Sequence, residues 1–271
     1  MAKQVIAFDI GGTSIRASIV ENNKIIEHEK IPTPKNKKLF LSEIEKLIEK
    51  LNSKKIYGIG IGIAGLIKDG KIGNAPNLAL KNFDLKKHLK NKYKKKVEIA
   101  NDAECFALAE AKLGIKKDNF ILLTFGTGIG GGIIIDGKIY NGQGYGAEFG
   151  HMNFSGKHFE GLWQNTRKEI RKEYKENKLF KELIKMKSPK SKKILKEASN
   201  YIGQGISSLI SAFDPEVVVI GGGIREADGP LLKLIKDAVR KHSFLKKNTP
   251  IVWTKLKHPG TLGASLLISK K

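Results

Sequence analysis

The sequence contains a single cysteine, Cys105, and it has no long hydrophobic run. One cysteine cannot form an intramolecular disulfide and cannot supply a cysteine-rich metal site. No apolar stretch approaches the ~20 residues that a membrane-spanning helix needs. The first residues also lack the long apolar stretch and the small-residue cleavage site of a signal peptide. These absences predict a cytoplasmic protein without a membrane partner.

Arginine is scarce although the chain is strongly basic. Lysine and arginine together number 50 against 27 acidic residues, for a net charge of +23, but only 5 of the 50 are arginine. Arginine is the side chain that contacts phosphates and guanines through two hydrogen bonds. The lysines are spread along the chain, with local clusters at 86–96 and 185–196. We therefore interpret the charge as solvated helix faces and expect no specific nucleic-acid partner, with a nucleic-acid role as the alternative.

The pattern of apolar residues predicts an α/β protein built from two similar sets of elements. A 271-residue chain that is 40% hydrophobic can bury the core of one large domain or two modest ones. Alternation predicts an antiparallel meander over 3–10, 15–20 and 24–30. Apolar residues at helical spacing predict an amphipathic helix over 38–51. The first set continues with a strand over 56–63, a helix over 82–95, a strand over 97–100 and a helix over 103–113. The second set has strands over 119–125, 129–135, 138–140, 216–220 and 250–253, and helices over 163–186, 190–213, 229–242 and 261–269.

A strand, a glycine turn and a second strand occur at 5–20 and again at 120–135. This repetition predicts two lobes, each presenting a phosphate-binding turn to a cleft between them. We expect the chain to cross between lobes near 113–118. The predicted N-terminal lobe is 1–114, completed by the helix of 258–271, and the C-terminal lobe is 115–257.

Three glycine segments are candidate phosphate or nucleotide contacts. A turn without side chains lets successive N–H groups approach phosphate oxygens, and a threonine hydroxyl adds a donor. Asp9 directly precedes the first turn, where it either caps the turn or holds a hydrated Mg²⁺ beside the phosphates. The candidate residues are Gly11, Gly12, Thr13, Gly126, Thr127, Gly128, Gly221, Gly222 and Gly223.

Asn101 and Asp102 lie where a short strand ends and a helix begins. Asp102 is either the N-cap of that helix or a carboxylate at the carboxyl end of a strand, where α/β sites gather. Such a carboxylate accepts the proton of a hydroxyl that attacks a phosphoryl group. In the glycine-rich loop 140–150 and just beyond it, Glu148, His151 and Glu160 offer polar partners for vicinal hydroxyls. Taken alone, His151 is equally an ordinary loop histidine.

Five segments, in order, resemble the sugar kinases of the ROK family (repressor, open reading frame, kinase). They read FDIGGTSIRASIV, NDAECFALAEA, GTGIGGGIIIDGKIYNG, GAEFGHM and VVVIGGGI, and the resemblance covers nearly the whole chain. It implies the two-lobed actin/hexokinase-like (ribonuclease-H-like) fold. It also implies ATP-dependent phosphorylation of a hexose or an N-acetylhexosamine.

The resemblance carries over residue by residue. Asp102 matches the catalytic base of the family and Asn101 a sugar-contacting asparagine. Glu148 and His151 match the Glu and His of the E-x-G-H motif, which contact the sugar ring. Gly65 matches a backbone contact to the sugar, and Asn77 falls near another sugar-side segment. The first and second glycine turns match the phosphate turns of the family, and Gly221–Gly223 lie near the nucleotide.

One segment departs from the family pattern. The family carries C-x-C-G-x-x-G-C-x-E soon after its E-x-G-H motif and binds zinc there together with the motif's histidine. This chain instead reads HMNFSGKHFEGLWQN, which is shorter and has no cysteine. Thiolate-bound zinc is therefore excluded, and no zinc site is expected. Aligning His158 with the end of the motif makes Glu160 the second sugar-binding glutamate.

These observations predict a kinase that uses ATP and Mg²⁺ to phosphorylate a hexose at its 6-hydroxyl, with glucose as the favoured substrate. An N-acetylglucosamine or N-acetylmannosamine kinase is the alternative substrate assignment. A sugar-responsive regulator of the same family is the alternative from another class, but such proteins carry an extra N-terminal DNA-binding domain, and the first phosphate motif here starts at Asp9. A sugar sensor without turnover is a third hypothesis. The family commonly forms dimers, so a homodimer is expected.

Overall fold

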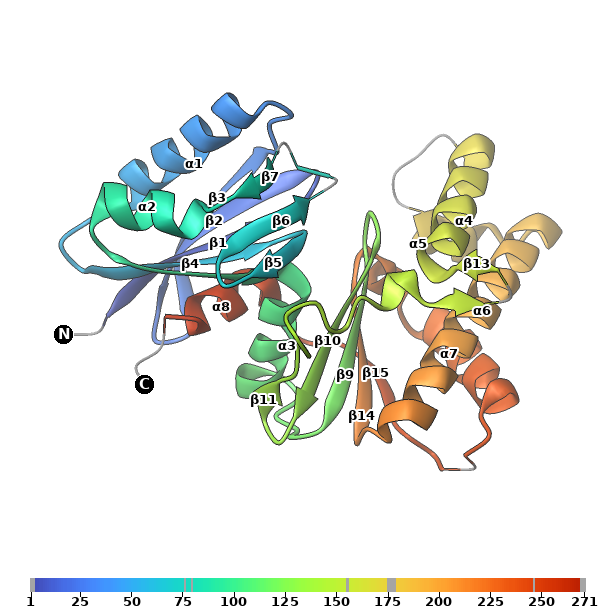
Figure 1. Ribbon diagram of the computed structural model, residues 1–271. Coiled ribbons are helices and arrows are strands. Elements are labelled where there is room, and N and C mark those ends of the chain that lie inside the picture. The colour runs from blue at the N-terminus through green and yellow to red at the C-terminus, as the bar shows by residue number, and fades with distance from the viewer. Residues whose placement is uncertain are drawn as a thin grey trace. The chain divides into compact units, whose positions relative to one another are not determined.

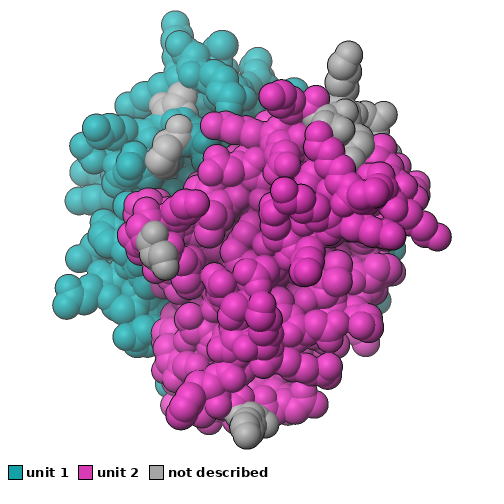
Figure 2. All heavy atoms as spheres, turned by 90° about the vertical axis from the view of Figure 1, so that its right-hand side faces the viewer, with its two compact units in different colours: residues 1–116, 138–146, 256–271 teal, residues 117–137, 147–255 magenta. Residues whose placement is uncertain are grey.

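The computed structural model describes residues 3–75, 77–78, 80–154, 156–174, 179–245 and 247–268. These residues form two compact units (Figure 2), each described by itself below. Unit 1 comprises residues 1–116, 138–146 and 256–271, and unit 2 comprises 117–137 and 147–255. None of the described helices is both long and apolar enough to cross a membrane.

Unit 1 contains a five-stranded sheet in the order β3-β2-β1-β4-β8 (Figure 1). Its first three strands pair antiparallel, which confirms the predicted meander, and β4 lies parallel to both β1 and β8. The strands are β1 (Gln4–Ile10), β2 (Ser14–Glu21), β3 (Lys24–Pro32), β4 (Ile56–Ile63) and β8 (Lys96–Asn101).

Helices cover both faces of this sheet. Alternate residues of β1 point to opposite faces. Ile6 and Phe8 pack in the core that includes residues of α1 and α2, whereas Ala7 packs with residues of α3 and α8. Figure 1 shows α1 and α2 on one side of the sheet and α8 on the other. The helices are α1 (Lys37–Leu51), α2 (Leu85–Tyr93), α3 (Asp102–Leu113) and α8 (Pro259–Leu266). Residues 269–271 of the predicted closing helix lie outside the described residues.

Glycines let α8 approach its neighbours closely. A Cβ on Gly60 of β4 would overlap the carbonyl oxygen of Ala264, and a Cβ on Gly263 would overlap that of Cys105. Only glycine fits where two backbones approach this closely. This packing buries the Cys105 side chain completely.

A second, three-stranded antiparallel sheet in unit 1 was not predicted. It consists of β5 (Leu66–Lys68), β6 (Lys71–Ala75) and β7 (Leu80–Phe83). Because residues 80–83 form β7, the helix predicted over 82–95 begins only at Leu85, where the Asp84 carboxylate caps it by accepting from the Lys87 N–H at 2.8 Å. These strands are short and rich in polar residues, so they carry little hydrophobic alternation.

Unit 2 contains four strands of a sheet in the order β10-β9-β14-β15. β9 and β10 form an antiparallel hairpin, and β14 is parallel to both β9 and β15. The strands are β9 (Phe120–Phe125), β10 (Ile129–Ile135), β14 (Val217–Gly222) and β15 (Ile251–Trp253), and the two-residue β11 (Lys138–Ile139) that follows β10 is counted with unit 1.

Four helices pack with this sheet in one large hydrophobic core. They are α4 (Phe159–Tyr174), α5 (Leu179–Met186), α6 (Pro189–Phe213) and α7 (Asp228–His242). The helix predicted over 163–186 is thus two helices, and its residues 175–178 lie outside the described residues. The smaller elements are η1 (Phe149–His151), β12 (Asn153–Phe154), β13 (Lys157–His158) and η2 (Gly223–Ala227).

The unit boundaries differ from the predicted lobe boundaries by two residues at 115–116 and at 256–257, and more substantially in one segment. The prediction placed all of 115–257 in one lobe, whereas residues 138–146 belong to unit 1. That segment packs on the small sheet, since Gly144 lies against the Lys68 side chain and the Tyr145 hydroxyl lies near Gly73. The sequence pattern contained no sign of this sheet and hence none of the contact.

Candidate active site

Asn101 and Asp102 occupy different positions at the junction between the carboxyl end of β8 and the start of α3. The Asn101 side-chain oxygen accepts from the N–H groups of Ala103 at 2.8 Å and Glu104 at 3.3 Å, so Asn101 is the N-cap of α3. Asp102 is the first helical residue, and its carboxylate also accepts from the Ala103 N–H at 3.0 Å. Capping therefore does not depend on Asp102, and the N-cap alternative for this residue is wrong.

The Asn101 amide also ties this strand end to Gly65. Its Nδ2 donates to the Gly65 carbonyl oxygen at 3.0 Å. Gly65 has φ +148°, and a Cβ there would lie 2.8 Å from both the Ala75 Cβ and the Asn74 carbonyl oxygen. The structure thus brings together three predicted site residues of unit 1, namely Gly65, Asn101 and Asp102.

The first glycine turn, Gly11-Gly12-Thr13, is held from the β3 side. The Thr33 hydroxyl donates to the Gly11 carbonyl oxygen at 2.6 Å, and the Lys35 ammonium donates to the Gly12 carbonyl oxygen at 2.7 Å. The Thr33 N–H also donates to the Thr13 carbonyl oxygen at 3.1 Å. Three carbonyl oxygens of the turn are therefore engaged by the segment that follows β3.

Asn77 lies against this turn. A Cβ on Gly12 would be 2.7 Å from the Asn77 Cβ, so only glycine permits the contact. The predicted sugar-side asparagine and the first predicted phosphate turn are therefore neighbours in unit 1. Pro76 and Ala79, which flank this segment in NAPNLAL, lie outside the described residues.

Asp9 lies in a charged cluster just before the turn. Its carboxylate forms an ion pair with Arg16 at 3.2 Å, directly across the β1–β2 pair. Burial raises the pKa of Asp9, while Arg16 and, more weakly, His258 and His28 oppose the shift. A Cβ on Gly260, in the first turn of α8, would be 2.9–3.1 Å from the Asp9 carboxyl group. Asp9 is therefore a mostly buried carboxylate that is ion-paired with Arg16.

The second glycine turn, Gly126-Thr127-Gly128, is held by three side chains of α4. The Trp163 indole N–H donates to the Gly126 carbonyl oxygen at 3.0 Å, and the Arg167 guanidinium donates to the Thr127 carbonyl oxygen at 2.7 Å. The Gln164 amide also donates to Thr127. Sequence reasoning missed these three α4 residues. Their only signal is helical spacing, since 163, 164 and 167 share one face of a helix.

Glu160, at the start of α4, faces the same turn. Its Oε2 accepts from the Ile129 N–H at 3.0 Å, and a Cβ on Gly128 would be 2.5 Å from that oxygen. A Cβ on Gly150 would be 3.1 Å from it. The structure thus places the predicted second sugar glutamate between the second turn and the loop that carries Glu148 and His151.

Glu148, His151 and Glu160 share one electrostatic environment in unit 2. Burial raises the pKa of Glu148, the negative Glu160 adds to the shift, and His151 opposes it. His151 is exposed at the end of η1, and its carbonyl oxygen lies 3.3 Å from the His158 Nδ1. In the described part of the chain, no group of three or more His, Cys, Asp and Glu side chains could hold a metal ion.

The third glycine segment lies beside the second turn at one edge of the unit 2 sheet. Gly221 and Gly222 pair in register with Thr124 and Phe125, the last residues before that turn. Gly222 has φ +87°, and a Cβ there would collide with the Phe125 carbonyl oxygen. A Cβ on Gly126 or Gly223 would meet nothing within 4 Å. Backbone is therefore accessible at the carboxyl ends of two parallel strands, where ligands bind in α/β sheets.

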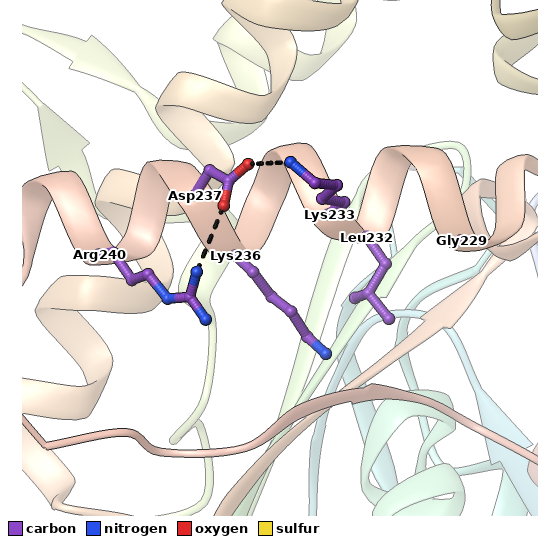
Figure 3. Close-up of a pocket in the computed structure, with 6 residues that line it drawn as sticks. All are labelled: Gly229, Leu232, Lys233, Lys236, Asp237 and Arg240. Carbon is purple, nitrogen blue, oxygen red and sulfur yellow. Dashed lines mark hydrogen bonds and ion pairs between the residues drawn. The ribbon is translucent and has the colours of Figure 1, made fainter.

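A separate hollow of about 490 Å³ runs along α7 and contains none of these residues. Its polar lining is an ion-paired row in which Asp237 contacts Lys233 at 3.0 Å and Arg240 at 3.5 Å (Figure 3). Lys236 and Leu232 extend from the same helix face, near Gly229. The lining carries three cations, Lys233, Lys236 and Arg240, against the single carboxylate of Asp237, and none of the predicted site residues is among them.

Comparison with known proteins assigns the family. The ROK family model matches residues 5–163 and 152–271. The chain belongs to the ROK family. A glucokinase of Streptomyces coelicolor is 29% identical over 275 residues, which is 87% of this chain and 86% of that protein. An N-acetyl-D-glucosamine kinase of Mannheimia succiniciproducens is 29% identical over 284 residues, which is 90% of this chain and 92% of that one.

The fold agrees with this family assignment. The crystal structure of a ROK family glucokinase from Streptomyces griseus in complex with glucose and AMPPNP has a TM-score of 0.85 and 25% identity. The match covers 97% of this chain and 98% of that chain. The predicted α/β class, with the two-lobed fold of the actin-like sugar kinases, is therefore confirmed.

Proposed function

We propose that this ROK family protein is an ATP-dependent sugar kinase that phosphorylates glucose at the 6-hydroxyl. The observation that carries the proposal is the end of β8. Asn101 caps α3 and binds the Gly65 carbonyl, so Asp102 stands at the start of the helix without being needed as its cap. That arrangement favours a carboxylate kept for chemistry rather than for folding.

Asp102 would act as the general base. A positioned carboxylate accepts the proton of the sugar hydroxyl while the oxygen attacks the γ-phosphoryl group. In phosphoryl transfer most of the remaining catalysis is positioning and electrostatic stabilisation. The Asn101–Gly65 hydrogen bond supports this role because it anchors the segment that carries the base.

Each unit contains candidate residues for contact with the sugar. Gly65, Asn77, Asn101 and Asp102 are the candidates in unit 1, and Glu148, His151 and Glu160 are those in unit 2. Vicinal hydroxyls suit such a set because each hydroxyl both donates and accepts a hydrogen bond. The position of the Glu160 carboxylate beside Gly150, which lies between Glu148 and His151 in the chain, supports their assignment to one ligand.

The glycine segments would hold the nucleotide. The backbone N–H groups of Gly11–Thr13 and Gly126–Gly128 would bind phosphate oxygens, and Gly221–Gly223 would lie along the nucleoside. AMPPNP, an ATP analogue, is present in the structure of the Streptomyces griseus relative, which supports ATP as the donor.

Asp9 fits a Mg²⁺ ion held through water. Mg²⁺ keeps several waters and binds proteins through one or two carboxylates together with substrate phosphates. Asp9 is a single carboxylate already engaged by Arg16, so it suits contact through a metal-bound water better than direct ligation. When bound, the ion would neutralise charge that develops on the phosphates.

Glucose is proposed as the first substrate because a glucokinase that is 29% identical matches 87% of this chain. An N-acetylglucosamine kinase matches equally well, so N-acetylglucosamine or N-acetylmannosamine is the alternative substrate. A sugar-binding regulator without turnover is the alternative of a different class. A homodimer also remains a prediction, which the molar mass measured by light scattering tests.

A coupled ADP-release assay over a panel of hexoses and N-acetylhexosamines tests the proposal. We expect turnover with ATP and Mg²⁺, highest with glucose, and a kcat about 10²–10⁴-fold lower with Asp102→Asn. Turnover with an N-acetylhexosamine alone would move the assignment to the alternative kinase. Sugar binding by calorimetry without ADP release from any sugar would refute a kinase and support the regulator.

A further inference from the structure

The two glycine turns are held in the same way although they belong to different units. In the first turn an uncharged donor, the Thr33 hydroxyl, binds the first carbonyl and a cation, Lys35, binds the second, at 2.6 and 2.7 Å. In the second turn the Trp163 indole binds the first carbonyl and a cation, Arg167, binds the second, at 3.0 and 2.7 Å. Each turn therefore has a cation on its second carbonyl oxygen.

These contacts determine where the N–H groups of each turn point. Every peptide bond among the described residues is trans, so the C=O of one residue and the N–H of the next point in opposite directions. Holding the Gly126 and Thr127 carbonyls against α4 directs the N–H groups of Thr127 and Gly128 away from that helix. Two successive N–H groups that point the same way form an anion-binding concavity.

The same geometry applies to the first turn. Holding the Gly11 and Gly12 carbonyls against the segment after β3 directs the N–H groups of Gly12 and Thr13 away from it. The cation in each turn thus lies behind the peptide, on the side opposite to the donor groups. The cation polarises the peptide group whose N–H donates to the anion. Its positive charge also attracts the anion directly, across the thickness of one peptide group.

We propose that Lys35 and Arg167 are positioning residues for the triphosphate, each acting through the glycine turn whose second carbonyl it binds. This inference rests on the proposed function, because it takes the turns as the phosphate sites. Neither residue belongs to the motifs that carry the family resemblance. Arg167 is one of only 5 arginines in the chain, whereas Lys35 is one of 45 lysines.

The two cations differ in strength. Arg167 is half-buried, and burial, with the neighbouring Arg171, lowers its pKa. Lys35 is exposed, so water and salt weaken its field. Arg167 should therefore contribute more to phosphate binding than Lys35.

Methionine variants separate charge from turn geometry. In Arg167→Met the Gln164 amide still donates to the Thr127 carbonyl, so the turn keeps one brace while the charge is lost. Arg171→Met is the matched control, because Arg171 is an exposed arginine one turn further along α4. Lys38→Met, at an exposed lysine near the start of α1, is the control for Lys35→Met.

The measurement is calorimetric binding of ATP, ADP and adenosine to each purified variant. We expect Arg167→Met to weaken ATP binding about tenfold and Lys35→Met about threefold, the scale of one charge-assisted contact that is lost. Adenosine binding should change less than twofold in both. Arg167→Lys should recover most of the loss. KM for ATP should rise in parallel, while KM for the sugar stays unchanged.

Two results would overturn the inference. One is an equal loss of ATP and adenosine binding, which marks a structural defect, and the other is an equal effect in the control variants. If Arg167→Met does not fold, Arg167→Gln keeps an uncharged donor at the same site and must show the same selective loss. A wild-type protein that binds no nucleotide would contradict both the proposed function and this inference, whereas ATP binding that every variant keeps would contradict this inference alone.

Discussion

Substitutions at the two adjacent residues Asn101 and Asp102 should separate folding from catalysis. Asn101→Ala removes the side chain that caps α3 and donates to the Gly65 carbonyl. Loss of an N-cap costs about 1 kcal/mol, and loss of one further hydrogen bond costs about 1 kcal/mol more. For a chain of this size, about 2 kcal/mol lowers Tm by about 4–8 °C.

Asp102→Asn should show the reverse pattern. Asn101 keeps the cap, and the variant loses the favourable interaction of a carboxylate with the helix N-terminus, about 0.3–1 kcal/mol. Loss of a positioned base should lower kcat by about 10²–10⁴. Asn101→Ala should instead raise KM for the sugar and lower kcat less.

Thermal melting followed by circular dichroism, together with the coupled ADP assay, measures both effects. The Asn101→Asp variant is a useful control, because aspartate also caps a helix but its side chain has no N–H to donate to Gly65. It should recover about half of the lost stability. If Asp102→Asn melted several degrees lower while keeping near-full kcat, Asp102 would be structural, and the assignment of the base would be refuted.

Three further predictions follow from unit 2. Gly222→Ala should lower the free energy of unfolding, measured by urea denaturation, by about 2–3 kcal/mol, because Gly222 has φ +87° and a Cβ there would collide with Phe125. Gly223→Ala is the control, and it should cost under about 0.5 kcal/mol because a Cβ there would meet nothing within 4 Å. Equal effects of the two would contradict the argument. Burial raises the pKa of Glu148 above its ordinary 4.5, so the stability tied to its protonated form is complete below 4.5 and is lost as pH rises through the raised value. Glu148→Gln should therefore melt higher than the wild type near pH 8 but not near pH 4, and a pH-independent difference would refute this. Elemental analysis of untagged protein should find no stoichiometric zinc, and a zinc-selective chelator with excess Mg²⁺ should leave turnover unchanged; activity lost to the chelator and restored by zinc would overturn that prediction.

The sequence predicted those parts of the fold in which periodicity and composition agree. The meander, the two strand–glycine–strand hairpins and most helices appear where alternation or helical spacing placed them. The three-stranded sheet of β5, β6 and β7 was missed because its strands are short and include polar residues such as Lys68, Lys71 and Asn74. Its contact with 138–146 was missed as a consequence, because no local pattern reports a contact between distant segments.

The site shows the same division between local and distant information. The glycine turns were visible as motifs, because only glycine suits close backbone approach. Asn101 and Asp102 are both good caps, so the sequence could not determine which of them caps α3. The α4 residues Trp163 and Arg167 escaped notice because their partners lie about 40 positions earlier in the chain.

Aromatic packing holds the start of α4, in the segment that the family resemblance aligns with a cysteine-containing zinc motif. Phe159, the first residue of α4, is completely buried and makes edge-on ring contacts with Phe125, Phe154 and Tyr201 at 6.0, 5.5 and 6.1 Å. Its N–H donates to the Met152 carbonyl oxygen at 2.9 Å, which closes the short β12–β13 hairpin. Several aromatic contacts of this kind, each adding about 0.5–1.5 kcal/mol beyond burial, can fix a helix start. Because Glu160 is the next residue, the cluster that anchors Phe159 also sets the distance from Glu160 to the second glycine turn. A substitution that weakens the packing of Phe159 should therefore weaken ligand binding even where unit 2 remains folded.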